Sequence, residues 1–142
     1  MPIKQNPDST DADVILKLYD LRRETVMRQS RDKLMREFQP MSFADLEAVG
    51  KADHPLNVAY RMVSSYWEMA AGFVKHGIVH PEVFGENCAE GLILFAKLQP
   101  FVAKLREGGS PLAFRNIEWV IEHSSEARKR FELYQARFRP QK

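Results

Sequence analysis

The segment between Leu56 and Val74 constrains the fold more than any other part of the chain. Most of its positions are apolar and they lie on two stripes of a helix, Ala59, Met62, Tyr66, Ala70 and Phe73 on one and Tyr60, Trp67 and Val74 on the other. A helix that is apolar nearly all round is covered by neighbours on several sides. We therefore predict that a buried helix over about 55–76 forms the centre of the domain.

Turn and cap signals divide the first part of the chain. Thr10 or Asp11 is expected to cap a long helix that runs to about residue 38, because acids in its first turn suit the helix dipole. Pro40 ends that segment. The stretch 42–45 resembles a capping box, which predicts a short helix closed by Gly50.

The second part of the chain carries similar signals. Gly77 is expected to end the central helix, and a further helix should begin near Glu86 and break at Pro100. Ser110 and Pro111 predict the start of the last helical segment, which either continues to Phe138 or breaks at Ser124-Ser125. Strand-like alternation rich in Val, Ile and Thr is absent, so the sequence predicts an all-α bundle of five to six helices.

Composition fits one domain over residues 1–142, since 44% of the residues are hydrophobic and 28% are charged. Residues 1–9 are polar and are expected to be a flexible N-terminus. No apolar run is long enough for a transmembrane segment. Cys88 is the only cysteine, which excludes an intrachain disulfide and favours a reducing, cytoplasmic location.

The C-terminal stretch 125–142 holds six basic residues and two acids, although the whole chain has a net charge of only +2. So small a net charge argues against specific binding to nucleic acid. The basic end could touch an acidic partner or make peripheral contact with a membrane surface. The simpler interpretation is a solvated helix end whose cations suit the dipole.

Glu68 is the conspicuous polar residue of the apolar segment. A buried carboxylate must be paired or neutralised, and arginines 22, 23, 28 and 115 are the candidate partners. Alternatively, Glu68 lies on a narrow exposed stripe with Arg61, Ser65 and Lys75. A third interpretation makes it a catalytic acid or base.

Other candidates for chemistry have simpler structural explanations. Histidines 54, 76, 80 and 123 lack the spacing of a metal site, so no metal is expected. Cys88 lies near a helix start but beside two glutamates, and a buried, inert thiol is favoured. The stretch 108–110 lacks the lysine of a phosphate loop and is read as a turn. No cofactor is expected.

Three stretches resemble one known family: Leu18-Tyr-Asp-Leu-Arg-Arg-Glu-Thr-Val-Met-Arg28, Tyr66-Trp-Glu-Met-Ala-Ala-Gly-Phe-Val-Lys-His-Gly77 and Phe114-Arg-Asn-Ile-Glu-Trp119. They are similar to a family of uncharacterised bacterial helical proteins, a domain of unknown function (DUF4760-like). The resemblance implies an α-helical domain without an assigned activity, so it transfers no catalytic residue.

The residues that stand out in these stretches are Tyr19, Arg22, Arg23, Trp67, Glu68, Arg115, Asn116 and Trp119. They combine arginines, one acid and aromatic rings. Such a mixture suits a polar and aromatic cluster held between helices, with either a structural or a binding role.

These observations favour a non-catalytic module that acts by binding a protein partner or a second copy of itself, as a homo-oligomer. One alternative is a bundle that binds a small molecule or lipid fragment. Its cavity would be lined by Met62, Tyr66, Trp67, Phe95 and Trp119. A second alternative is an enzyme that uses Glu68 or a histidine.

Overall fold

The computed structural model describes residues 3–138, and within that range it contains helices and no strand. The helices are α1 (Ser9–Arg22), α2 (Thr25–Glu37), α3 (Phe43–Val49), α4 (Asn57–Lys75), α5 (Pro81–Asn87), α6 (Ala89–Leu98), η1 (Gln99–Phe101, a 3-10 turn), α7 (Val102–Glu107), α8 (Arg115–His123) and α9 (Ser125–Phe138). The all-α prediction is confirmed, but there are more helices than the five to six expected.

The additional helices arise where side chains cap the backbone inside segments that look continuous in the sequence. The expected helix over 10–38 divides at Arg23 and Glu24, because the Glu24 carboxylate accepts hydrogen bonds from the N–H groups of Val26 and Met27. Ser124 separates α8 from α9 in the same way, through the N–H group of Ala127. A side-chain oxygen that satisfies such N–H groups begins a new helix at its own position.

Two predicted helix starts are displaced. Asp8, rather than Thr10 or Asp11, caps α1 in a reciprocal capping box with Asp11. Ser110 and Pro111 do not open the last helical segment, because residues 111–114 form turns and α8 begins only at Arg115. The residue before α8, Phe114, has φ 59°, an uncommon conformation for a bulky side chain.

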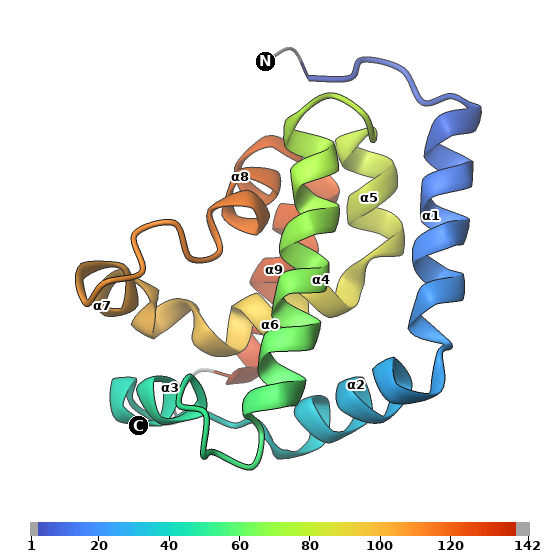
Figure 1. Ribbon diagram of the computed structural model, residues 1–142. Coiled ribbons are helices and arrows are strands. Elements are labelled where there is room, and N and C mark those ends of the chain that lie inside the picture. The colour runs from blue at the N-terminus through green and yellow to red at the C-terminus, as the bar shows by residue number, and fades with distance from the viewer. Residues whose placement is uncertain (1–2, 139–142) are drawn as a thin grey trace.

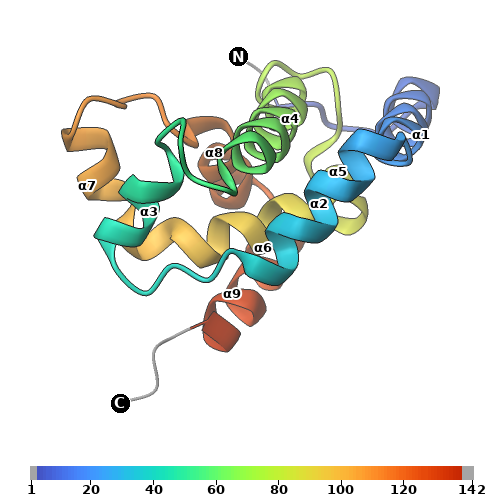
Figure 2. The same cartoon turned by 60° about the horizontal axis from the view of Figure 1, so that its bottom comes forward.

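Helix α4 runs through the middle of Figure 1, with α2 below it and α8 and α5 at its sides. Its buried residues include Val63, Trp67 and Val74, whereas Val58 and Met69 are exposed on its outer edge. Figure 2 shows α6 beneath α4 and α9 beyond α6. In the described residues no helix is both long enough and apolar enough to cross a membrane.

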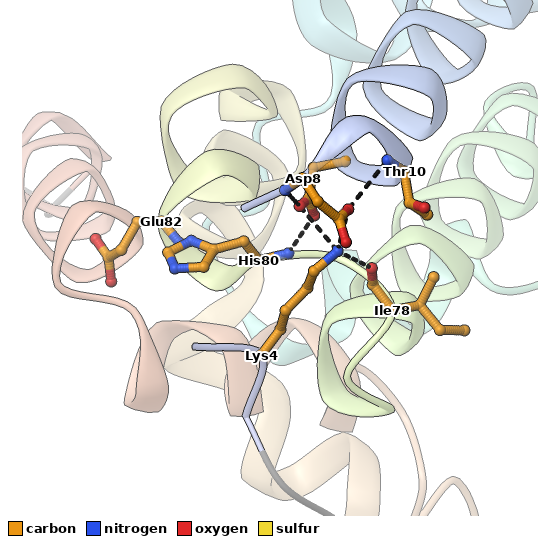
Figure 3. A network of polar contacts seen from close by, with 7 residues as sticks. Lys4, Asp8, Thr10, Ile78, His80 and Glu82 are labelled. Atoms are coloured by element: carbon orange, nitrogen blue, oxygen red, sulfur yellow. Dashed lines mark hydrogen bonds and ion pairs between the residues drawn. The ribbon is translucent and has the colours of Figure 1, made fainter. Parts of the chain in front are cut away.

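A polar network ties the start of the chain to the loop after α4 (Figure 3). The Asp11 side chain is 2% exposed and accepts hydrogen bonds from the N–H groups of Asp8 and His80, at 2.8 and 2.6 Å. Lys4 Nζ lies 2.9 Å from Asp11 and donates to the Ile78 carbonyl. Because His80 caps α5, Asp11 fixes α1 against the start of α5.

Glu82, in the first turn of α5, caps the N-terminus of α9. Its carboxylate accepts hydrogen bonds from the N–H groups of Ser125 and Glu126, at 2.8 and 2.9 Å. The C-terminal end of α2 is bound by a cation instead. Buried Lys97 donates hydrogen bonds to the carbonyls of Met35 and Phe38 at that end. Charged side chains of one helix thus complement the dipole of another.

Candidate functional site

Four of the predicted cluster residues meet where α1 passes α4. The Arg22 guanidinium lies 5.3 Å from the Trp67 ring centre and 5.5 Å from that of Tyr19, and Arg23 lies 6.0 Å from Tyr19. These are cation–π distances. Trp67 is only 2% exposed and borders a void of about 10 Å³, too small for a ligand, so its ring is part of the core.

Glu90 of α6 completes this contact, although its place in the sequence marked it only as a neighbour of Cys88. Trp67 Nε1 donates to Glu90 at 3.0 Å, and Arg31 forms an ion pair with the same carboxylate at 2.8 Å. Arg31 also donates to the Arg22 carbonyl at the end of α1. The signal that could have identified Glu90 is the one used for Glu68, an isolated acid in an apolar stretch.

Cys88 lies near this ion pair but offers no reactive thiol. Its side chain is buried, and burial raises the pKa of the thiol to about 12, an effect that Arg22 reduces in part. The thiol is therefore protonated at neutral pH and is a poor nucleophile.

Glu68 has different partners from those expected. No arginine pairs with it among the described residues; its carboxylate accepts hydrogen bonds from the backbone N–H groups of Asn116 and Ile117, at 3.2 and 2.8 Å. The Asn116 side chain donates back to the Glu68 carbonyl at 3.2 Å. Glu68 therefore caps α8 from α4, in place of a capping side chain on α8 itself.

The ionisation of Glu68 reflects two opposed effects. Burial raises the pKa of its carboxyl group above the ordinary value, while the N–H groups of Ile117 and Asn116 lower it in part. Arg106 and Lys75 act in the same direction as those N–H groups, through their charges alone. The carboxylate is half-buried and bound to a helix end, which is an architectural arrangement.

Arg115 and Trp119 lie apart from the Trp67 contact. Arg115 donates to the Pro111 carbonyl and approaches Glu118 at 3.6 Å, both in its own segment. Trp119 stacks on His123, with ring centres 4.0 Å apart. The predicted residues therefore form two structural contacts, one at Trp67 and one at α8, rather than a single cluster.

The histidines and acids do not converge on one point. Within residues 3–138, no three His, Cys, Asp or Glu side chains are grouped as metal ligands would be. His54 and His80 each use Nδ1 to accept a backbone N–H group two residues further along the chain. Both imidazoles serve as local caps.

A groove with a volume of about 1150 Å³ lies between α3, α4 and α7. It is open to solvent and is closed at one side by the loop that leads into α8. Its apolar lining consists of Phe43, Leu46, Val58, Tyr60, Met62, Leu105, Leu112, Ala113 and Phe114. The cavity expected from the sequence shares only Met62 with this groove.

Two large apolar side chains of the groove are unusually exposed. Leu112, on the loop before α8, is 80% exposed, and Val58, at the start of α4, is 65% exposed. Polar groups in the lining include Ser64, Ser65 and Glu68. Burial raises the pKa of Tyr60, also in the lining, to about 12, so this phenol remains neutral.

The charges around the groove are mixed. Lys51, Arg61 and Glu47 line it and are exposed, and none of the three forms an ion pair within the described part of the chain. Glu68, the other acid, is already bound to the start of α8. Among the described residues, the charged side chains of the groove that have no partner are therefore two cations and one anion.

Comparison with known proteins identifies a family and no further relative. No curated protein and no solved structure matches the chain. The family match covers residues 7–124, which include α1 to α8 and every residue of the groove. The chain therefore belongs to the family described as Domain of unknown function (DUF4760).

Proposed function

We propose that this domain is a non-catalytic protein-binding module whose working surface is the groove between α3, α4 and α7. Its occupant is a short amphipathic helix of a partner protein, apolar on the face that enters the groove and acidic along its edge. In this proposal α4 is the scaffold that carries one wall of the groove.

The observation that carries the proposal is the exposure of Val58 and Leu112 on one groove. Leu112, at 80%, is the most exposed large apolar side chain among the described residues. Exposed apolar side chains that gather around a hollow favour a binding surface, because covering them removes apolar area from water.

The shape of the groove favours a peptide over a small molecule. Sites for small ligands enclose most of the ligand surface, whereas helical segments lie in open apolar grooves. This groove is open to solvent and is bordered by helices on two sides. An amphipathic helix would cover Val58 and Leu112 together and leave its polar face in water.

The charges around the groove favour an acidic edge on the partner. Within residues 3–138, Lys51 and Arg61 have no ion pair to break before they bind a carboxylate, and Glu47 is the single acid of the groove lining without a partner. The Glu68 carboxylate is occupied by the N–H groups of Asn116 and Ile117. That arrangement supports a binding role over an acid–base role.

The test uses a pair of labelled synthetic peptides, each a helix of about 14 residues with leucines at i, i+3, i+4 and i+7. In one peptide glutamates flank the leucines. In the other peptide the leucines are kept and lysines replace the glutamates. Fluorescence anisotropy should show saturable binding of the glutamate peptide, at least about fivefold tighter than that of the lysine peptide.

Variants locate the binding. Val58→Asp and Leu112→Ser should each weaken binding of the glutamate peptide by about tenfold, as loss of a central apolar contact does. Leu133→Ser is the matched control, since Leu133 is an exposed leucine on α9 away from the groove. The proposal is overturned if neither peptide binds, if the lysine peptide binds more tightly, or if decanoate saturates the groove while both peptides fail.

A further inference from the structure

Helix α1 has an exposed apolar stripe that the groove does not use. Ala12, Leu16 and Tyr19 follow one another at helical spacing on its outer side, Arg23 continues this line just past the end of the helix, and all four are exposed. Leu16 is 66% and Tyr19 is 55% exposed. In Figure 1, α1 stands at the edge of the molecule, on the side opposite α3 and α7.

Four exposed charges accompany this stripe, and they balance. Asp13, Lys17, Asp20 and Arg23 are two acids and two bases, and none forms an ion pair within residues 3–138. A surface with no net charge does not repel a second copy of itself. It can attract that copy only in an arrangement that places unlike charges together.

The antiparallel arrangement does so. If two α1 helices pair about a twofold axis between Leu16 and Tyr19, each Leu16 meets the Tyr19 of the other copy. Asp13 then lies level with the Arg22–Arg23 end of the other copy, and Lys17 lies within about 3 Å along the axis of its Asp20, at 1.5 Å of rise per residue. A parallel pair would instead place this charged flank on opposite sides of the contact in the two copies, so Lys17 and Asp20 would not meet across it.

We propose that α1 is the interface of a symmetric, antiparallel homodimer of this chain, built on Leu16 and Tyr19. This inference goes beyond the proposed function, since it uses a different helix and a different partner. A contact limited to one helix per copy is at the small end of specific interfaces, so the dimer is weak and exchanges readily.

Sedimentation velocity from about 10 µM to about 1 mM tests this association, a range that spans weak dimers. The wild-type chain should shift from monomer to dimer over that range. Leu16→Asp should remain a monomer throughout, and Leu133→Asp, the same change on α9, should dimerise like the wild type. A wild-type chain that stays monomeric at the highest concentration would overturn the proposal.

A charge exchange tests the register. Lys17→Glu should weaken the dimer, because it places a carboxylate beside Asp20 of the other copy, and the double variant Lys17→Glu, Asp20→Lys should restore it. Failure of that restoration would contradict the register. All these positions are exposed, so the variants are expected to fold.

Cysteine cross-linking tests the direction of pairing. A mixture of Ala12→Cys and Arg23→Cys chains should form the mixed disulfide under mild oxidation, while Ala12→Cys alone should not cross-link. Native Cys88 is buried and does not compete. A disulfide between two Ala12→Cys chains would show a parallel pair and overturn the antiparallel interface. These outcomes do not involve the groove, so they are independent of the peptide experiment.

Discussion

Three carboxylates connect helices that are distant in the sequence, and each does so through backbone N–H groups. Asp11 binds the N-terminus of α5, Glu68 binds that of α8 and Glu82 binds that of α9. A helix start carries a partial positive charge and unpaired N–H groups, so an ionised acid from another helix satisfies both. These residues position helices.

Asp11→Asn should lower the free energy of unfolding by about 2 kcal/mol at neutral pH, since the amide cannot accept both N–H groups and also bind Lys4. Burial acts to raise the pKa of Asp11, but the N–H groups of His80 and Asp8, with Lys4, outweigh it and leave the pKa below its ordinary value. The stabilisation is therefore present above the unfolded-state pKa and is lost as the pH falls through the folded-state pKa.

Urea unfolding at pH 7, 5 and 3 checks this expectation. The difference between the wild type and Asp11→Asn should be full at pH 7 and should shrink at pH 3. Asp53→Asn is the control, because Asp53 is exposed, lies outside α1 and forms no ion pair within the described residues. A difference that stays constant with pH would show that the carboxylate charge contributes nothing.

At the residue scale, the sequence identified Glu68 as a constrained acid but not its partner. Arginines were the expected partners, because residue types can be read from a sequence. The actual partners are N–H groups of Asn116 and Ile117, which every non-proline residue possesses. They become available only because Phe114 ends the preceding turn and α8 begins next to α4.

At the scale of the elements, the breaks between helices were harder to predict than the helices. The apolar spacing continues through Glu24, so periodicity joins α1 to α2, whereas Ser124 already marked a break in the segment that α8 and α9 form. Local hydrogen bonds from these two side chains decide the breaks. Ser42, Gly50 and Gly77 behaved as expected, because their signals are local and have no competitor.

The packing of α5 on α9 depends on Gly85. A Cβ atom at this position would lie 2.7 Å from the Ala127 backbone nitrogen and 2.9 Å from Ser124 Oγ. Gly85→Ala should therefore separate the two helices and cost about 2–3 kcal/mol, despite the better helix propensity of alanine. For a chain of this size the melting temperature should fall by about 6–12 °C.

Gly50→Ala is the matched control for that experiment. Gly50 has φ −73°, which alanine adopts without strain, and its Cβ atom would meet only the Glu47 carbonyl at 3.4 Å. Its melting temperature should stay within about 2 °C of the wild type. Equal effects of the two substitutions, measured by calorimetry, would contradict the close approach of α5 and α9.

For the whole molecule, composition and periodicity were sufficient to predict an all-α domain, but not its surfaces. The groove combines α3, α4, α7 and the loop before α8, which the chain brings together only after folding. Aromatic residues pointed to a cavity at Trp67 and Phe95, yet both are buried in the core. A search by residue type favours large rings, and such rings usually pack against one another.

Helices α3 and α7, which border the groove, lie on the side of the molecule opposite α1 in Figures 1 and 2, so the two proposed interactions should be energetically independent. Substitutions that share no partner and lie far apart add in free energy. The coupling free energy between the two surfaces should therefore be below about 0.5 kcal/mol. Leu16→Asp should leave the affinity for the glutamate peptide within about twofold of the wild type. Val58→Asp should leave the dissociation constant of the dimer within the same margin. Anisotropy and sedimentation on both single variants and on the double variant check this additivity. A tenfold loss of peptide affinity in Leu16→Asp would show instead that the groove is complete only in the dimer.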